Sequence, residues 1–248
     1  MNQYLPQMIV LAAFGAVSPF VAMGQEDETE LKMREAGALT KVYKTTSDSD
    51  GNAVALNAYL FYPPEHGASD RRPAIVFFFG GGWKNGSPTQ FIEHCRYLAS
   101  RGMVAITADY RVLSRQGTKA VKCVADGKSA VRWIRRNAAQ LGVDAARVAA
   151  GGGSAGGHVA ACTGVIDGFD EPGEDLTISS RPDALVLFNP AVVLAQIDDR
   201  PPLDESKLAE LPERMGTNPR DLSPVQHVTK GAPPTILFHG RDDKTVPY

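Results

Sequence analysis

The sequence predicts an α/β fold in which a mostly parallel central sheet is flanked by helices. Apolar runs typical of buried strands alternate with segments of helical periodicity along most of the chain. In addition, two glycine-rich clusters, in residues 80–82 and 151–157, directly follow such apolar runs. Since glycine weakens the interiors of strands and helices, these clusters indicate tight turns at strand ends.

The composition is that of one globular domain. The 248 residues are 43% hydrophobic and 22% charged, and 26 basic against 28 acidic residues give a net charge of −2. This length suits one large α/β domain with a sizeable core. No run of lysine or arginine stands out, so the sequence does not indicate a nucleic-acid partner. We interpret the scattered charges as a solvated surface.

Residues 1–24 are interpreted as a signal peptide that precedes a domain of residues 25–248. They contain no charged residue, and the apolar residues 8–17 are followed by small residues before Gln25. Ser18 and Pro19 interrupt the apolar run before it reaches the ~20 residues that a membrane span needs. We therefore expect no stable membrane span and a secreted or periplasmic product. An uncleaved anchor and a cytoplasmic product stay open as alternatives, because the first residues lack lysine and arginine.

The first half of the chain begins with an acidic segment, residues 26–37, that we expect to be a solvated lead-in. Residues 41–46 and 54–63 predict a β-hairpin, because Asp50-Gly51 between them supplies turn chemistry. The next expected elements are a buried strand, a helix closed by Gly102 and a second buried strand, in residues 73–79, 89–102 and 103–110.

The second half of the chain continues the alternation. Apolar residues at helical spacing predict a helix over residues 119–142. The expected elements after it are a strand, a helix and two more buried strands, in residues 147–153, 155–165, 183–190 and 234–240. The proline-rich stretch between Ala195 and Pro234 is too long for a simple connection. It is either a lid over a site or an elaborated crossover with a short helix in residues 204–215.

Ser154 lies at the centre of the pattern Gly152-x-Ser154-x-Gly156, between an expected strand and an expected helix. A nucleophile on a sharp strand-to-helix turn takes a strained backbone conformation, and the residues two positions away must lack side chains. The start of the helix also favours negative charge. We predict that Ser154 is a catalytic nucleophile; the alternative is a structural glycine turn with an idle serine.

A second glycine segment, Gly80-Gly81-Gly82-Trp83, follows the expected strand of residues 73–79. Backbone amides without side chains after a central strand can donate to a developing oxyanion. We predict an oxyanion hole formed by the amides of Gly81, Gly82 and Ala155, and a substrate contact at Trp83 that restricts the acyl pocket to short groups. The alternative is a flexible glycine loop.

These motifs resemble the α/β-hydrolase fold, and specifically its esterase/lipase branch related to hormone-sensitive lipase and acetyl esterases. From about Tyr43 to Tyr248, "FGGGW" resembles the branch's H-G-G-G-W, "ADYR" its D-Y-R, and "GGGSAGGH" its nucleophile motif. "FHGRDDKTVPY" resembles H-G-x-x-D-x-x-V-P, which implies Asp243 as the catalytic acid, with Asp242 as the alternative. Phe79 replaces the histidine of the glycine loop, so we expect a rewired loop that still supports catalysis.

The resemblance also implies the chain order serine, aspartate, histidine, and no residue follows Tyr248. We therefore expect a chain that is truncated before the catalytic histidine, with the last strand and helix of the fold missing. His158, four residues after Ser154 on one helix, is the alternative base. We interpret His158 as a packed, hydrogen-bonded residue, and we expect His239 to brace the loop of the acid.

Cys95, Cys123 and Cys162 fit no zinc or redox motif, and we expect neither a metal nor a cofactor. Cys123 and Cys162 fall on helices that we expect to be neighbours, so they could form a disulfide in an exported protein. Buried free thiols are the preferred interpretation.

The sequence therefore predicts a serine carboxylesterase that cleaves short-chain acyl esters through an acyl-enzyme. The resemblance suggests small-molecule or carbohydrate esters as substrates, among them acetyl or feruloyl groups on polysaccharide. Two alternatives stay open: an amide or formamide hydrolase on the same fold, and a non-catalytic hydrolase fragment.

Overall fold

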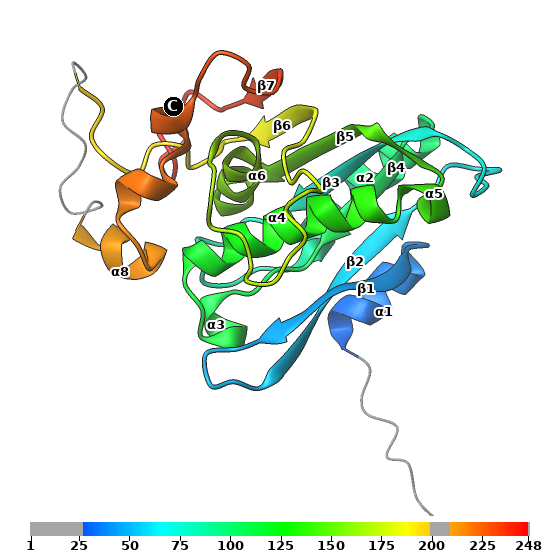
Figure 1. Cartoon of the computed structure of the whole chain (residues 1–248), viewed down its shortest axis with the longest axis horizontal. Coiled ribbons are helices and arrows are strands. Elements are labelled where there is room, and N and C mark those ends of the chain that lie inside the picture. Colours follow the sequence, from blue (N-terminus) through cyan, green and yellow to red (C-terminus); the bar gives the residue numbers. More distant parts are fainter. Residues whose placement is uncertain (1–26, 199–208, 248) are drawn as a thin grey trace, which may run out of the picture.

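The computed structural model describes residues 27–198 and 209–247 (Figure 1). The predicted signal peptide lies outside the described residues, and so do residues 204–208 of the predicted helix of residues 204–215. In the described part of that segment, residues 209–215, a short helix, α8, spans Leu211–Met215. Among the helices of the described residues, none is both long and apolar enough to cross a bilayer.

A seven-stranded sheet in the order β1-β2-β4-β3-β5-β6-β7 forms the centre of the molecule. The predicted hairpin is confirmed, because β1 pairs antiparallel with β2. β2 is also antiparallel to β4, whereas the five strands from β4 to β7 run parallel to one another. The predicted mostly parallel sheet is thus confirmed. The strands are β1 (Leu39–Ser47), β2 (Ala53–Phe61), β3 (Arg72–Phe78), β4 (Val104–Ala108), β5 (Val143–Gly153), β6 (Ala184–Phe188) and β7 (Thr235–Phe238).

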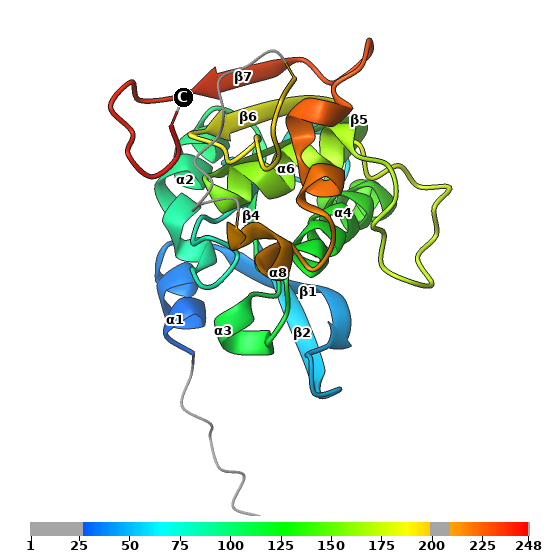
Figure 2. The ribbon, with the colours of Figure 1, turned by 90° about the vertical axis from the view of Figure 1, so that its left-hand side faces the viewer.

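Helices cover both faces of the sheet. Figure 2 shows α1 and α2 on one side and α4 on the other. A large apolar core lies between the sheet and the helices α4 and α6, and a smaller one lies under α1 and α2. The remaining helical elements are α1 (Glu28–Glu35), η1 (Pro88–Phe91), α2 (Ile92–Ser100), α3 (Leu113–Gln116), α4 (Ala120–Arg136), α5 (Ala138–Leu141), α6 (Ala155–Val165), η2 (Pro219–Leu222) and η3 (Pro224–His227).

The predicted solvated lead-in of residues 26–37 is largely exposed in its described part, residues 27–37, but the prediction misses a helix and a buried residue. The segment forms α1, whose first turn is capped by Asp27: its Oδ1 accepts a hydrogen bond from Thr29 N at 2.9 Å. Met33 is 0% exposed and belongs to the smaller core. One buried methionine among charged residues is too weak a pattern to reveal a packed helix from sequence.

The interpretation of all charges as solvated surface also needs correction. The carboxylate of Asp126, on α4, is fully buried. It accepts hydrogen bonds from Lys44 Nζ at 2.6 Å and from Arg111 Nε at 2.9 Å, and Glu171 Oε2 accepts from both cations. Because each charge is paired, the cluster is tolerated inside the protein. We call these four residues, Lys44, Arg111, Asp126 and Glu171, the buried charge cluster.

The three cysteines are free and buried in the structure. Burial raises the pKa of the Cys123 and Cys162 thiols. The Cys123 thiol donates to Arg111 O at 3.1 Å. These observations agree with the preferred interpretation of free thiols over a Cys123–Cys162 disulfide.

Candidate active site

Ser154 occupies the junction between the last residue of β5 and the first residue of α6. Its backbone has φ 53° and ψ −118°, a conformation that non-glycine residues rarely adopt. The predicted strand, tight turn and helix are therefore confirmed, and so is the strained backbone at the serine. A residue held in such a conformation requires support from its surroundings.

The glycines on either side of Ser154 leave room for this turn. A Cβ atom on Gly152 would collide with the backbone oxygen of Gly156, and one on Gly156 would collide with the backbone oxygen of Phe78. The close approach of β5, α6 and the end of β3 thus explains why the pattern requires glycine two residues before and two residues after the serine.

Hydrogen bonds from the neighbouring strand hold the turn. Ser154 N donates to Phe188 O at 3.0 Å, and Ala191 N donates to Ser154 O at 3.2 Å. Both partners belong to the end of β6 and the residues that follow it. The backbone of Ser154 is therefore fixed on both sides of its Cα.

The glycine loop after β3 lies beside the nucleophile turn. A Cβ atom added to Gly80 would lie 3.4 Å from Ser154 Cβ. Gly81 and Gly82 have φ values of 144° and 62°. Within the described residues, neither of their amides donates a hydrogen bond, and the amide of Ala155 at the start of α6 also has no acceptor. The arrangement agrees with the predicted oxyanion hole, whose role in binding stays a prediction.

Phe79 and Trp83 anchor the two ends of this loop in the core. The Phe79 ring stacks on Tyr110 with their centroids 4.0 Å apart. Trp83 is 5% exposed, and its Nε1 donates to His158 Nδ1 at 3.1 Å. This position favours a supporting role for the indole over the substrate contact that the sequence predicts at Trp83, a contact that stays a prediction.

His158 is a packed, hydrogen-bonded residue, as interpreted from the sequence. Because Nδ1 accepts from Trp83, the proton is on Nε2, which donates to Leu222 O at 2.7 Å. Burial lowers the pKa of His158 to about 4. Since both ring nitrogens are occupied, His158 cannot take a proton from Ser154 in this arrangement.

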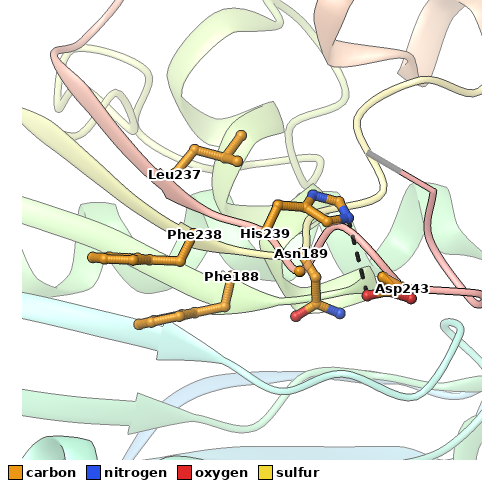
Figure 3. A pocket seen from close by; sticks show the side chains of 7 residues that line it. Phe188, Asn189, Leu237, Phe238, His239 and Asp243 are labelled. Atoms are coloured by element: carbon orange, nitrogen blue, oxygen red, sulfur yellow. Dashed lines mark ion pairs between the residues drawn. The ribbon is translucent and has the colours of Figure 1, made fainter.

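Asp243 lies in the loop after β7. Its Oδ1 accepts hydrogen bonds from Val246 N at 2.9 Å and Thr245 N at 2.8 Å, and these bonds lower the pKa of the carboxyl group. His239 Nε2 donates to Val246 O at 2.6 Å and lies 3.9 Å from Asp243 Oδ2 (Figure 3). The expectation that His239 braces this loop is thus confirmed. Asp242 is exposed, and its side chain has no partner among the described residues, so the geometry favours Asp243 as the acid.

The parallel strands bring the nucleophile turn and the loop of Asp243 to the same side of the sheet, at the carboxyl-terminal ends of the strands. Ser154 follows β5, Asn189 follows β6 and Asp243 follows β7, and these strands are neighbours. Figure 3 shows Asn189, His239 and Asp243 close together, whereas the stacked rings of Phe188 and Phe238 point away from them. A pocket of about 660 Å³ lies here; its lining includes Asn189, His239, Gly240 and Asp243.

The five histidines of the chain all lie within the described residues, and none of them hydrogen-bonds the Ser154 hydroxyl. His66 contacts Leu141 O, and His227 contacts Arg220 O. His94 packs against the rings of Phe91 and Phe188. The described residues also contain no group of His, Cys, Asp and Glu side chains that could hold a metal ion.

One residue of the site carries no signal in the sequence. The Gln90 side chain, on η1, pairs with both backbone groups of Gly80: Oε1 accepts from Gly80 N at 2.9 Å, and Nε2 donates to Gly80 O at 3.0 Å. Only the tertiary structure reveals this contact, because no periodicity or motif relates a glutamine to a glycine ten residues earlier.

The sheet order, the strained serine turn and the adjacent glycine loop together define an α/β hydrolase. The sequence profile of the BD-FAE family matches residues 60–248, and the chain belongs to this family of α/β-hydrolase esterases.

Curated relatives include the esterase LipC of Mycobacterium tuberculosis, 31% identical over 71% of this chain and 45% of its own length. Another is the probable isoprenylcysteine alpha-carbonyl methylesterase ICMEL1 of Arabidopsis thaliana, 27% identical over 77% of this chain and 42% of its own. The chain thus spans about half the length of the curated relatives that it matches.

Solved structures of Thermogutta terrifontis esterase 2 are similar over 85% of this chain. The form phosphonylated by sarin has a TM-score of 0.79 and 50% identity, with 75% of its chain covered. The butyrate-bound form has a TM-score of 0.77 and 51% identity, with 74% covered. The predicted α/β-hydrolase fold is thereby confirmed.

Proposed function

We propose that the protein is a serine carboxylesterase that cleaves short-chain acyl esters through an acyl-enzyme on Ser154. The observation that carries this proposal is the strained turn at Ser154, with φ 53°, beside the glycine loop, in which the amides of Gly81 and Gly82 have no acceptor within the described residues. Such a turn exposes a serine hydroxyl above the sheet. The esterases among the relatives support the reaction class.

The reaction follows from these groups. Ser154 Oγ attacks the ester carbonyl as its proton passes to a histidine base, and the amides of Gly81, Gly82 and Ala155 donate to the oxyanion. The protonated histidine then gives its proton to the departing alcohol. A water molecule, deprotonated by the same histidine, attacks the acyl-enzyme, and the acid leaves as Ser154 regains its proton.

The histidine base in this proposal is a residue outside the 248 of this chain. Two observations support it: all five histidines of the chain have other contacts, and a quarter of the solved relative lies outside the similarity. Asp243 would orient that histidine. The lowered pKa of Asp243 favours its charged carboxylate. The catalytic acid must carry this charge in order to stabilise the imidazolium that forms during the reaction.

The proposed substrates are small esters with short acyl groups. Thermogutta terrifontis esterase 2 has been solved with propionate and with butyrate bound, and this chain is 51% identical to both forms. For the natural substrate we propose acetyl or feruloyl esters of polysaccharide, met by a secreted or periplasmic enzyme. The panel of p-nitrophenyl acetate, p-nitrophenyl butyrate, methyl ferulate and a formanilide separates these substrates from an amide or formamide hydrolase.

The test uses the protein expressed from its complete gene. We expect Ser154→Ala to lower kcat/KM for p-nitrophenyl acetate by a factor of about 10³ or more, because it removes the nucleophile. Ser100→Ala, at the distant end of α2, is the control and should keep full activity. A fluorophosphonate should label Ser154, as read by peptide mass spectrometry. Full activity in Ser154→Ala, or a label on another residue, would contradict the proposal.

A further inference from the structure

The directions of the two donors in the glycine loop depend on the carbonyl groups before them. A trans peptide is planar, so its C=O and its N–H point in opposite directions. The Gly81 N–H belongs to the same peptide as the Gly80 C=O, and the Gly82 N–H to the same peptide as the Gly81 C=O. The groups that hydrogen-bond to the Gly80 and Gly81 carbonyls therefore fix the directions of the Gly81 and Gly82 amides, which point the opposite way.

The Gly81 carbonyl is held by the loop itself. It accepts hydrogen bonds from Lys84 N at 3.1 Å and Asn85 N at 3.2 Å. These two bonds form a turn of the backbone, which fixes the direction of the Gly82 amide without any side chain.

The Gly80 carbonyl is held by a side chain. Among the described residues, only Gln90 Nε2 donates to it, at 3.0 Å. The same amide group accepts from Gly80 N at 2.9 Å through Oε1. Gly80 N belongs to the Phe79–Gly80 peptide, and the carbonyl of that peptide, Phe79 O, accepts from Tyr110 Oη at 2.5 Å. Gln90 therefore contacts two successive peptides, and Tyr110 holds the first of them from the opposite end.

The Gln90 side chain is exposed, but its backbone is well anchored. Gln90 N donates at 3.2 Å to the carbonyl oxygen of Ser87, the residue that precedes η1. The next residue, Phe91, is buried and stacks on Phe77 with a centroid distance of 4.7 Å. The amide of Gln90 thus reaches the glycine loop from a fixed position.

We propose that Gln90 is a positioning residue of the oxyanion hole, which aims the Gly81 amide by holding the carbonyl of Gly80, a residue that lies beside Ser154. This inference rests on the proposed esterase function. The role suits glutamine because its planar amide offers one donor and one acceptor side by side, as pairing with both backbone groups of one residue requires. A glutamate can only accept when charged, and a methionine of similar length can do neither.

The first experiment compares Gln90→Met with the unchanged protein from the complete gene. Loss of one oxyanion donor costs about 10²–10³ in kcat, and we expect a misaimed donor to cost about 10–100-fold with KM nearly unchanged. Gln226→Met is the matched control, because Gln226 also donates its amide to a backbone carbonyl, that of Gln196, at 2.8 Å. The control should keep the kcat of the unchanged protein. Both variants should unfold at the same temperature as the unchanged protein, within the error of the measurement.

The second variant, Gln90→Glu, supplies a readout that a purely structural role would not change. A carboxylate accepts from Gly80 N but repels Gly80 O, whereas a protonated carboxyl group donates again. The ratio of kcat in Gln90→Glu to kcat in the unchanged protein should therefore rise as pH falls toward about 4–5, the range in which glutamate protonates. A crystal structure of Gln90→Met should show the Gly80–Gly81 peptide rotated.

The outcomes separate the inference from the function on which it rests. If the unchanged protein hydrolyses no ester, the proposed function fails and the inference fails with it. If the unchanged protein is active and Gln90→Met keeps its kcat, only the inference is overturned. A loss confined to KM, or a ratio for Gln90→Glu that does not depend on pH, would also overturn the positioning role.

Discussion

At the scale of single residues, the candidate site depends on two glycines that have no side chain. Gly152 and Gly156 let β5, α6 and the end of β3 approach so closely that a methyl group on either glycine would touch backbone oxygen. Backbone cannot rotate away as a side chain can, so the collision must move a strand or a helix. The conformation of Ser154 is thus set by packing that a single added carbon would disrupt.

We predict that Gly156→Ala destabilises the protein by at least about 1–3 kcal/mol, the usual cost of overpacking, and abolishes activity by displacing Ser154. Urea unfolding and turnover of p-nitrophenyl acetate measure the two effects. Gly67→Ala is the control, since a Cβ atom there has only Ser69 Oγ within 4 Å, at 3.8 Å. A Gly156→Ala variant as stable as Gly67→Ala would contradict this account of the turn.

At the scale of elements, the buried charge cluster ties distant segments together. Lys44 lies on β1, Arg111 follows β4, Asp126 lies on α4, and Glu171 belongs to the loop between α6 and β6. Burial alone would raise the pKa of Glu171, but the hydrogen bonds and charges of Lys44 and Arg111 outweigh it and leave that pKa below its usual value. The folded state therefore holds this carboxylate in its charged form more strongly than the unfolded chain does.

This pKa shift predicts how stability depends on pH. A lowered folded-state pKa contributes stability that is present above the unfolded pKa of about 4.3 and is lost as pH falls through the lower folded value. We expect Glu171→Gln to lower the free energy of unfolding at pH 7 and to lose this difference from the unchanged protein below about pH 4. Urea unfolding at a series of pH values checks it. Glu28→Gln, which removes an exposed ion pair with Lys32, is the control and should change little at any pH.

Local patterns predict part of the fold and of the site from sequence. The apolar runs predict the buried strands, because strands covered on both faces need apolar side chains throughout. The turn at Ser154 is predictable because its steric requirement concerns residues only two positions apart. Met33 in α1 and the amide of Gln90 escape such patterns, since their partners are set by the tertiary fold. The buried position of Trp83 likewise depends on a partner, His158, that lies on another element.

At the scale of the whole molecule, the two edges of the sheet differ. β1 carries Lys41 and Lys44 and has an irregular register at Val42–Lys44, features that disfavour pairing with another strand. β7, with the sequence TILF, has no charge, and it lies at the outer edge beside β6 (Figure 2). Ile236, Leu237 and Phe238 on β7 are 51%, 49% and 49% exposed. An uncharged apolar edge of this kind pairs readily with other chains.

We therefore predict that residues 25–248, produced by themselves, self-associate through β7 and hydrolyse esters only at a residual rate. Size-exclusion chromatography over a range of concentrations, with light scattering, measures the association. Leu237→Lys should raise the monomer fraction, because a charge on the edge strand opposes edge-to-edge pairing. Leu39→Lys is the control, because Leu39 is exposed as well but lies on the already protected edge strand β1, and it should leave that fraction unchanged.

The residual rate follows from the absence of a histidine at the Ser154 hydroxyl among the described residues, since the oxyanion amides alone keep only a small part of triad catalysis. Monomeric behaviour at all concentrations would show that β7 is protected, and full turnover would show that one of the five histidines serves as the base.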